Sequence, residues 1–394
     1  MNTNLVPAGD THLLVRSERT PLKVESFDTL SASSSTADPA PPKMRTEEGF
    51  MDAGSSETQV HVVLNRFGAP EVLEVARGTV PQPGPGEVRV RVEASSVQYT
   101  DTLIRKGVYP DLKQKPPVVT GYDFVGHIDA LGEGVTGWKV GERVADLTMV
   151  GANARYIVRP AAGLVRVPGD VDAAEATTLV LSWMTAYQAL KRHGRVQRGE
   201  RVLLLGGNGA VGQAGIVLAK QMGADVYATA SERQHDTLRQ LGAKPLPRDD
   251  WHAAVRELGG MDVIVDGVCA DGFRGSYRAL RRGGRLVAIG FTAQTSRDRL
   301  LPIYGAFMFL GLTKLMPDGR HATFYGITAD RKSDPASFRE DLEQLFTWHA
   351  QGAISPAVAH RVSLDEVPAY HRKIEEGGLI GKVVVIPDQR ARAT

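Results

Sequence analysis

The segment from Arg201 to Lys220 constrains the fold of this chain more than any other. An apolar run is followed by the pattern Gly207-x-Gly209-x-x-Gly212 and then by a helical run. Between a strand and a helix, this pattern lets backbone N–H groups and a helix N-terminus approach a phosphate, because no Cβ stands in the way. The alternative is a tight turn that holds no ligand. We expect the turn to bind the pyrophosphate of a dinucleotide. The residues that would do so are Gly207, Asn208, Gly209, Ala210, Val211 and Gly212.

The bulk properties of the chain argue against several classes of protein. Its 394 residues suit two or three domains, and its net charge of +2 gives no reason to expect binding to nucleic acid or to an anionic membrane. Cys269 is the single cysteine, so the chain can form neither an internal disulfide nor a zinc site with several thiolates. The longest apolar run, at 300–312, is broken by proline and glycine and is too short to span a bilayer. With no signal-peptide pattern at 1–9, we expect a cytoplasmic protein without stable membrane insertion.

Two patterns of secondary structure follow an N-terminal extension. Residues 1–58 show no sustained period and include a small, polar, proline-rich stretch, which predicts disorder. Short alternating strands such as Val88–Glu93 then predict an antiparallel, partly barrel-like domain. After a helix capped by Asp172, strands alternate with helices, which predicts βαβ units and a parallel sheet. The last strand, at 382–386, belongs to a segment too small to fold alone, which we expect to return to the first domain.

Seven motifs follow one another between residues 60 and 387. They are Val108-Tyr-Pro110, Gly121-Tyr-Asp-Phe-Val-Gly126, Gly132-Glu-Gly-Val-Thr-Gly-Trp-Lys-Val-Gly-Glu-Arg-Val144, Thr185-Ala-Tyr-Gln-Ala-Leu190, Gly207 to Gly212, Leu280-Arg-Arg-Gly-Gly-Arg-Leu286 and Gly381-Lys-Val-Val-Val385. In this order they resemble the medium-chain dehydrogenase/reductase superfamily, in particular its zinc-free quinone oxidoreductase branch with zeta-crystallin-like and vesicle amine transport protein-like members. The resemblance implies NADPH-dependent reduction of quinones or of activated alkenes.

The fold class that these observations imply is α/β. The resemblance adds a GroES-like catalytic domain, partly barrel-like, and a Rossmann cofactor domain with a doubly wound parallel sheet. We expect the disordered extension at 1–58, the GroES-like domain at 59–178 and 329–388, the Rossmann domain at 179–328, and a tail at 389–394.

The positions of the zinc ligands in related alcohol dehydrogenases are occupied here by other residues. Those enzymes use an early cysteine and a Gly-His-Glu segment, whereas this chain has Ser95–Gln98 and Gly121-Tyr122-Asp123. His127 is a single imidazole, and a tetrahedral site needs three protein ligands. We therefore expect no metal. Without a Lewis acid, reduction of a substrate already polarised by a conjugated carbonyl is favoured over alcohol oxidation.

The cofactor assignment depends on the strand that follows the glycine turn. NAD-specific folds place an acid at the end of this strand, but here Asp225–Ala230 ends in alanine. Ser231 and Arg233 follow and favour the 2′-phosphate of NADPH. Glu232 is an acid close to this strand end and argues against NADPH. The alternative interpretation of Arg233 is a solvated residue that contacts no cofactor.

Three residues are candidates for contact with the substrate or the nicotinamide. Tyr109 matches the position that resembles the catalytic tyrosine of mitochondrial enoyl thioester reductases. The resemblance places Tyr99 in the cleft wall and Thr185 on a helix that faces the nicotinamide. The alternative for Tyr109 and Tyr99 is a structural role, in which the ring packs and the hydroxyl lies at a surface. The alternative for Thr185 is a hydrogen bond from its hydroxyl to its own i−4 carbonyl. Asp101 and Arg105, at i,i+4 spacing, predict a structural ion pair.

The preferred hypothesis is an NADPH-dependent oxidoreductase that acts on a small molecule, either a quinone or an α,β-unsaturated carbonyl compound. One alternative is an enoyl thioester reductase. Another is a non-catalytic NADPH-binding or membrane-associated protein. Relatives pair through the last strand of the cofactor domain, expected here at 321–327, so the resemblance also implies a homodimer.

Overall fold

The computed structural model describes residues 58–292, 300–377 and 379–389. The predicted extension at 1–58 and the predicted tail at 389–394 therefore lie outside the described residues, except for residues 58 and 389. Within the described ranges the strands form three sheets, of three, six and seven strands.

The seven-stranded sheet is assembled from both ends of the described chain. Its spatial order is β15-β16-β3-β5-β6-β8, and β7 also pairs with β3. The strands are β3 (Glu87–Val97), β5 (Asp123–Leu131), β6 (Arg143–Leu147), β7 (Tyr156–Pro160), β8 (Val165–Arg166), β15 (Val358–Val362) and β16 (Lys382–Val385). In β3, Val88, Val90 and Val92 are buried in alternation with two arginines, which is the pattern of a strand with one covered face. The late strand β16 pairs antiparallel with β3, placing Val383 opposite Val97.

A smaller antiparallel sheet comes from the first strands. Its order is β2-β1-β4, and its strands are β1 (Gln59–Leu64), β2 (Leu73–Gly78) and β4 (Val118–Val119). The alternating patterns before Asp172 thus form antiparallel sheets, as predicted, while β2 is a strand that the sequence reasoning missed.

The six-stranded sheet is parallel throughout, which confirms the prediction from alternating strands and helices. Its order is β11-β10-β9-β12-β13-β14. The strands are β9 (Arg201–Leu205), β10 (Asp225–Ala230), β11 (Lys244–Pro247), β12 (Met261–Asp266), β13 (Leu280–Ala288) and β14 (His321–Phe324). The helices after the first four of these strands are α4 (Ala210–Gln221), α5 (His235–Gln240), α6 (Trp251–Glu257) and α7 (Arg274–Arg278). Every residue of β12 is buried, as expected for a central parallel strand covered on both faces.

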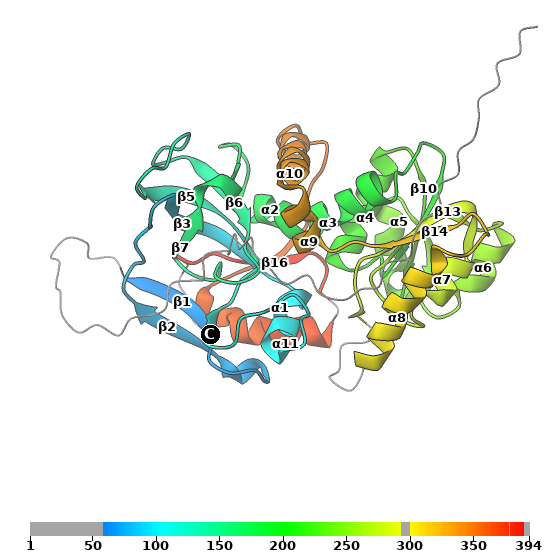
Figure 1. The fold of residues 1–394 in the computed structure, drawn as a ribbon, viewed down its shortest axis with the longest axis horizontal. Coiled ribbons are helices and arrows are strands. Elements are labelled where there is room, and N and C mark those ends of the chain that lie inside the picture. Colours follow the sequence, from blue (N-terminus) through cyan, green and yellow to red (C-terminus); the bar gives the residue numbers. More distant parts are fainter. Residues whose placement is uncertain (1–57, 293–299, 378, 390–394) are drawn as a thin grey trace, which may run out of the picture. The chain divides into compact units, whose positions relative to one another are not determined.

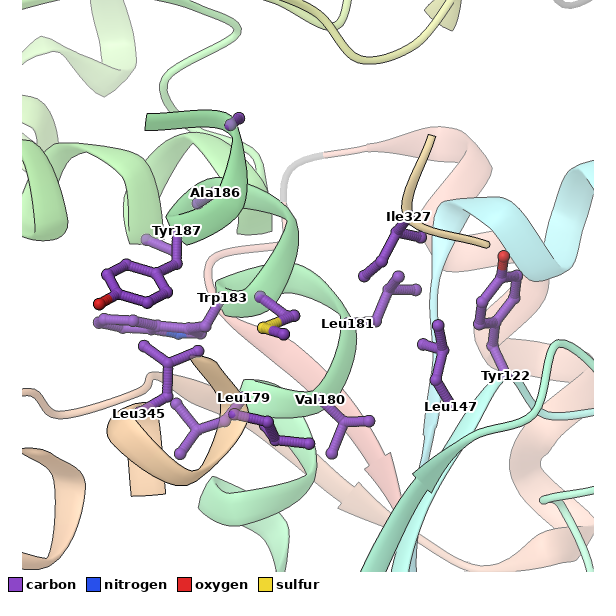
Figure 2. Packing of buried hydrophobic residues seen from close by; sticks show 14 of the residues in the cluster. Tyr122, Leu147, Leu179, Val180, Leu181, Trp183, Ala186, Tyr187, Ile327 and Leu345 are labelled. Carbon is purple, nitrogen blue, oxygen red and sulfur yellow. The ribbon is translucent and has the colours of Figure 1, made fainter. Parts of the chain in front are cut away.

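One long helical segment carries much of the core. It runs through α2 (Ala173–Thr178), a π-helical segment (Leu179–Trp183), α3 (Met184–Gln188) and a second π-helical segment (Ala189–His193). The Asp172 carboxylate caps it by accepting a hydrogen bond from the Glu175 N–H, as predicted. Figure 2 shows Trp183 beside Leu345, and Leu181 between Ile327 and Leu147. The segment therefore buries side chains in more than one direction.

Two short helices that are far apart in the sequence lie side by side, α1 (Tyr99–Lys106) and α11 (Val367–Glu376) (Figure 1). The buried Arg105 Nη2 donates to Glu375 Oε1 at 2.6 Å. The Asp101 carboxylate instead accepts from the Gln98 N–H at 2.9 Å, in a capping box. The predicted ion pair between Asp101 and Arg105 is therefore wrong, because helix capping and a partner on α11 take these two side chains.

The remaining helices are α8 (Leu300–Thr313), α9 (Ile327–Ser333) and α10 (Pro335–Ala350). The apolar run at 300–312 is thus helical, and Tyr304, Met308 and Leu312 on it are exposed. None of the helices in the described residues is both long and apolar enough to cross a membrane.

A buried carboxylate joins the long helical segment to α10. Asp341 is fully buried and accepts hydrogen bonds from Gln188 Nε2 at 2.9 Å, Lys191 Nζ at 3.0 Å and Arg192 Nη2 at 2.8 Å. Burial acts to raise the pKa of Asp341, but the hydrogen bonds from Arg192, Gln188 and Lys191 outweigh it and lower the pKa below its ordinary value. The ionised carboxylate is therefore the form that stabilises this contact.

We predict that Asp341→Asn lowers the free energy of unfolding at pH 7 by roughly 2 to 4 kcal/mol, because it leaves cationic partners without their buried counter-charge. The neighbouring Glu340→Gln is the matched control, since Glu340 also bonds Arg192 but its side chain is 70% exposed. Because the folded-state pKa is lowered, the contribution of Asp341 exists above its unfolded-state pKa and is lost as the pH falls through the folded-state pKa. Urea unfolding at pH 7 and pH 3 would measure both effects, and equal losses in the two variants would contradict the assignment.

Candidate functional site

The glycine turn between β9 and α4 is shaped by four glycines, each with its own role. Gly206 has a φ of +77°, a left-handed conformation that favours glycine, although the sequence pattern had singled out Gly207 instead. A Cβ on Gly207 would lie 2.6 Å from the Ala228 Cβ of β10. A Cβ on Gly212 would lie 2.3 Å from the Gly206 carbonyl oxygen. The turn is therefore packed too tightly for side chains at these two positions.

Gly209 differs from Gly207 and Gly212 because its surroundings are open. It is exposed, and the nearest atom to a Cβ built there is the Gly206 carbonyl oxygen at 3.5 Å. It is the residue just before α4, whose first residues are Ala210, Val211 and Gly212. The N–H groups of a first helical turn have no partner within the helix, so they remain available to an anion that approaches Gly209. The open face of the turn thus fits a phosphate.

The turn and the end of β10 are held together by Thr229. Its carbonyl oxygen accepts from the Gly207 N–H at 2.8 Å, and its hydroxyl accepts from the Gly206 N–H at 3.1 Å. Directly after β10, the Ser231 hydroxyl is buried and has no hydrogen-bond partner within residues 58–292, 300–377 and 379–389. Arg233 is exposed in the following short 3-10 helix. The residues predicted for the pyrophosphate and for the 2′-phosphate therefore stand on adjacent strand ends of one sheet.

A cavity lies beside the N-terminus of α4. Its lining includes Ser182, Trp183, Ala210, Gln213, Gly381 and Lys382. The cavity therefore joins the helix that follows the glycine turn to the first π-helical segment and to β16. The sequence analysis assigned no role to Lys382. The residue belongs to one of the family motifs, which begins with Gly381-Lys382, and this motif could have identified it as a candidate site residue.

Lys382 places an amino group in the interior of the protein. It is 4% exposed, and its Nζ donates to Gln98 Oε1 and, at 2.8 Å, to Ser182 Oγ. Burial lowers the pKa of Lys382, while the nearby carboxyls of Asp123 and Asp101 oppose that shift. Burial also raises the pKa of Asp101 to about 7 and raises that of Asp123 above its usual range. A cluster of three buried ionisable groups therefore lies behind the cavity wall.

The residues in the positions of zinc ligands are engaged with other partners. The Asp123 carboxylate accepts from Ser96 Oγ and, at 3.2 Å, from Gln98 Nε2. The hydroxyl oxygen of Tyr122 lies 2.8 Å from that of Tyr109. Among the described residues, no three or more His, Cys, Asp or Glu side chains are grouped so that they could hold a metal ion. A phenol and one fully bonded carboxylate do not fit a tetrahedral zinc ion.

The three candidate contacts with substrate occupy different elements. Tyr109 is half-buried in the segment after α1, and Tyr99 is the half-buried first residue of α1. Thr185 lies in α3 and is 9% exposed. No hydrogen bond of its hydroxyl, including one to its own i−4 carbonyl, is found in the part of the chain that the structure describes. Tyr109 is thus brought to Tyr122.

Comparison with known proteins gives the family. The model for the alcohol dehydrogenase GroES-like domain matches residues 84–169, and the model described as zinc-binding dehydrogenase matches residues 241–385. The 2-haloacrylate reductase of a Burkholderia species is 30% identical over 337 residues, which are 82% of this chain and 98% of that protein. The chain belongs to the medium-chain dehydrogenase/reductase superfamily.

Other matches agree with this assignment. The structure of a mycobacterial quinone oxidoreductase has a TM-score of 0.70 and 29% sequence identity, covering 84% of this chain and all of that one. A mycocerosic acid synthase-like polyketide synthase of Mycobacterium tuberculosis is 28% identical over 378 residues, which are 91% of this chain but only 17% of the synthase. The chain thus spans a small part of the first relatives it matches.

Within the superfamily, these relatives confirm the predicted zinc-free quinone oxidoreductase branch. The predicted fold class is confirmed as well, since a GroES-like domain match accompanies a parallel sheet of the Rossmann type. The domain boundaries and the site residues stay predictions.

We predict that Gly212→Ala destabilises the protein by roughly 2 to 4 kcal/mol, because the new Cβ overlaps backbone atoms that no side-chain rotation can move. The matched control is Gly209→Ala, where a Cβ makes only ordinary contacts and the expected change is within about 1 kcal/mol. Urea unfolding of both variants measures the difference. Equal stabilities would show that the close packing of Gly212 against Gly206 is not what shapes the turn.

Proposed function

We propose that the protein is an NADPH-dependent oxidoreductase that reduces an α,β-unsaturated carbonyl compound or a quinone. The observation that carries this proposal is the open face of the glycine turn beside a cavity lined by a buried lysine, with no acid at the end of β10. The similarity to a 2-haloacrylate reductase and to a quinone oxidoreductase supports the same class of reaction.

The residues present fit a dinucleotide with a 2′-phosphate. The first turn of α4, beside the exposed Gly209, offers N–H groups to a pyrophosphate, and the Lys382 side chain lines the same cavity. The Ser231 hydroxyl has no hydrogen-bond partner among the described residues, and the exposed Arg233 follows it, so these two side chains offer donors to a 2′-phosphate. When bound, the reduced nicotinamide would supply a hydride to the conjugated substrate, which becomes an enolate.

The chain then has to provide a proton and hold the substrate. Burial raises the pKa of Tyr109 to about 12, so this phenol keeps its proton at neutral pH and can act as a donor but not as a base. We assign proton delivery to Tyr109. Tyr99 and Thr185 are proposed to orient the substrate or the carboxamide of the cofactor.

The matches to polyketide synthases favour a second candidate, an enoyl thioester reductase. Both candidates use the same hydride and proton chemistry and differ in what is attached to the carbonyl. We also propose a homodimer, because β14 is the edge strand of the six-stranded sheet and presents unpaired backbone groups. A cytoplasmic location stays a prediction.

We expect the purified protein to oxidise NADPH when offered 2-enals, 2-enones or 1,4-benzoquinones, which is followed as a loss of absorbance at the nicotinamide band. Turnover restricted to 2-enoyl thioesters would select the second candidate. Binding of NADPH without turnover of any of these compounds would overturn both and leave a non-catalytic, NADPH-binding protein.

We predict that Arg233→Ala weakens NADPH binding by roughly 10-fold or more and leaves NADH binding within about twofold, because a charge-assisted contact to the 2′-phosphate is lost. Arg239→Ala, at an exposed arginine of α5, is the matched control and should change neither affinity. Titration of tryptophan fluorescence with each cofactor gives the dissociation constants. An equal loss of affinity for both cofactors would argue against a 2′-phosphate contact.

A further inference from the structure

Two phenol groups meet at the position that a zinc ligand occupies in related enzymes. The hydroxyl oxygens of Tyr109 and Tyr122 are 2.8 Å apart, and the rings stand edge to face, with centroids 6.0 Å apart and an interplanar angle of 83°. Tyr122 is fully buried, whereas Tyr109 is half-buried. The contact therefore joins a fully buried residue to one that is partly exposed.

Either hydroxyl can donate in this contact, and the difference in burial favours Tyr122, because the Tyr109 oxygen is the one acceptor that the described residues offer to the proton of the buried Tyr122 hydroxyl. Burial raises the pKa of both phenols, and it holds that of Tyr122 further above its usual range than that of Tyr109. The hydrogen bond from Tyr122 lowers the pKa of Tyr109 and so opposes the effect of burial, because it stabilises a negative charge on the Tyr109 oxygen. A phenol has one proton to donate and two sites to accept. With Tyr122 as the donor, the proton of Tyr109 stays free for another acceptor.

Tyr122 is held firmly by its own surroundings. Its ring lies in the main core beside Leu147, with Leu181 and Ile327 close by (Figure 2). Its carbonyl oxygen accepts from the N–H groups of Thr148 at 2.7 Å and Met149 at 3.1 Å. A phenylalanine would fill the same space, yet the chain buries a hydroxyl here, and Tyr109 is its partner.

We propose that Tyr122 is a positioning residue that donates a hydrogen bond to the Tyr109 oxygen and so directs the Tyr109 proton toward the substrate. This inference rests on the proposed function, in which the conjugated carbonyl has become an enolate. The O–H bond of Tyr109 breaks, and the proton forms a C–H bond with the electron pair of the enolate α-carbon. The negative charge stays on the Tyr109 oxygen, where the Tyr122 hydrogen bond stabilises it until water returns a proton.

The other groups around Tyr109 cannot replace this donor. Asp111 and Asp101 are acidic and raise the pKa of Tyr109. The Thr328 hydroxyl also acts to lower the pKa of Tyr109, but its single proton is donated to Asp111 Oδ2 at 2.6 Å. Tyr122 is therefore the neighbour whose proton is directed at the Tyr109 oxygen.

A double-mutant cycle on turnover tests the inference. Tyr109→Phe should lower kcat roughly 100-fold, the usual scale for loss of a positioned acid. Tyr122→Phe should lower kcat roughly 5- to 10-fold, the scale of one hydrogen bond, and leave KM within about twofold. Because Tyr122 acts through Tyr109, the double variant should be no slower than Tyr109→Phe. Tyr277→Phe is the matched control, since it removes one hydroxyl that bonds Asp318 at 2.9 Å, away from this site. Equal effects of Tyr122→Phe in both backgrounds would overturn the inference.

A second readout needs no turnover and separates the two proposals. With 3-fluorotyrosine placed at position 109 of the full chain, Tyr122→Phe should shift the fluorine resonance, whereas Tyr277→Phe should not. An unchanged resonance in the Tyr122→Phe protein would overturn the inference even if the enzyme is active. A shifted resonance together with no turnover of any substrate would support the hydrogen bond and the donor assignment but overturn the proposed function.

Discussion

The buried amino group of Lys382 needs hydrogen-bond partners, and several parts of the chain meet to supply them. A buried polar group without partners is unfavourable, so the hydrogen bonds to Gln98 and Ser182 and the nearby Asp123 carboxyl offset the cost of burying Lys382. These partners come from the end of β3, the first π-helical segment and the start of β5. The pairing therefore ties β16 to three other parts of the chain and, at the same place, forms a wall of the cavity beside α4.

The candidate site follows from the same arrangement. The glycine turn leaves an open, donor-rich face at Gly209, and its other side is closed by the packing of Gly212 against Gly206. Tyr122, which the sequence resemblance aligns with a zinc ligand of related enzymes, instead contacts the hydroxyl of Tyr109. The glycine turn thus suits an anionic cofactor, and the tyrosine pair can supply a neutral proton donor.

The sequence allowed a good prediction of the fold and a partial one of the site. Strands β3, β10 and β16 and the parallel sheet were predicted because their apolar patterns are local. The short strand β11 and helix α6 were missed, since brief segments carry little periodicity. Two adjacent glycines do not reveal which one takes the positive φ, so Gly206 was overlooked.

Contacts between distant residues were beyond local patterns altogether. Arg105 pairs with Glu375, 270 positions away, and Lys382 reaches Gln98, 284 positions away. The spacing of Asp101 and Arg105 predicted a pair between them, but spacing on a helix says nothing about competing partners on other elements. The contact of Tyr109 with Tyr122 was likewise unpredictable, because the path of the segment between them is set by tertiary packing.

The pairing of β16 with β3 has a consequence for the order in which the protein can be made. The six-stranded sheet uses residues 201–324 alone, so it can form while synthesis continues. In the seven-stranded sheet, β3 must wait for residues 382–385, which are translated nearly 300 residues later. Until then one side of β3 and the partners of Lys382 stay uncovered, which makes this half of the nascent chain the one that most needs protection by chaperones.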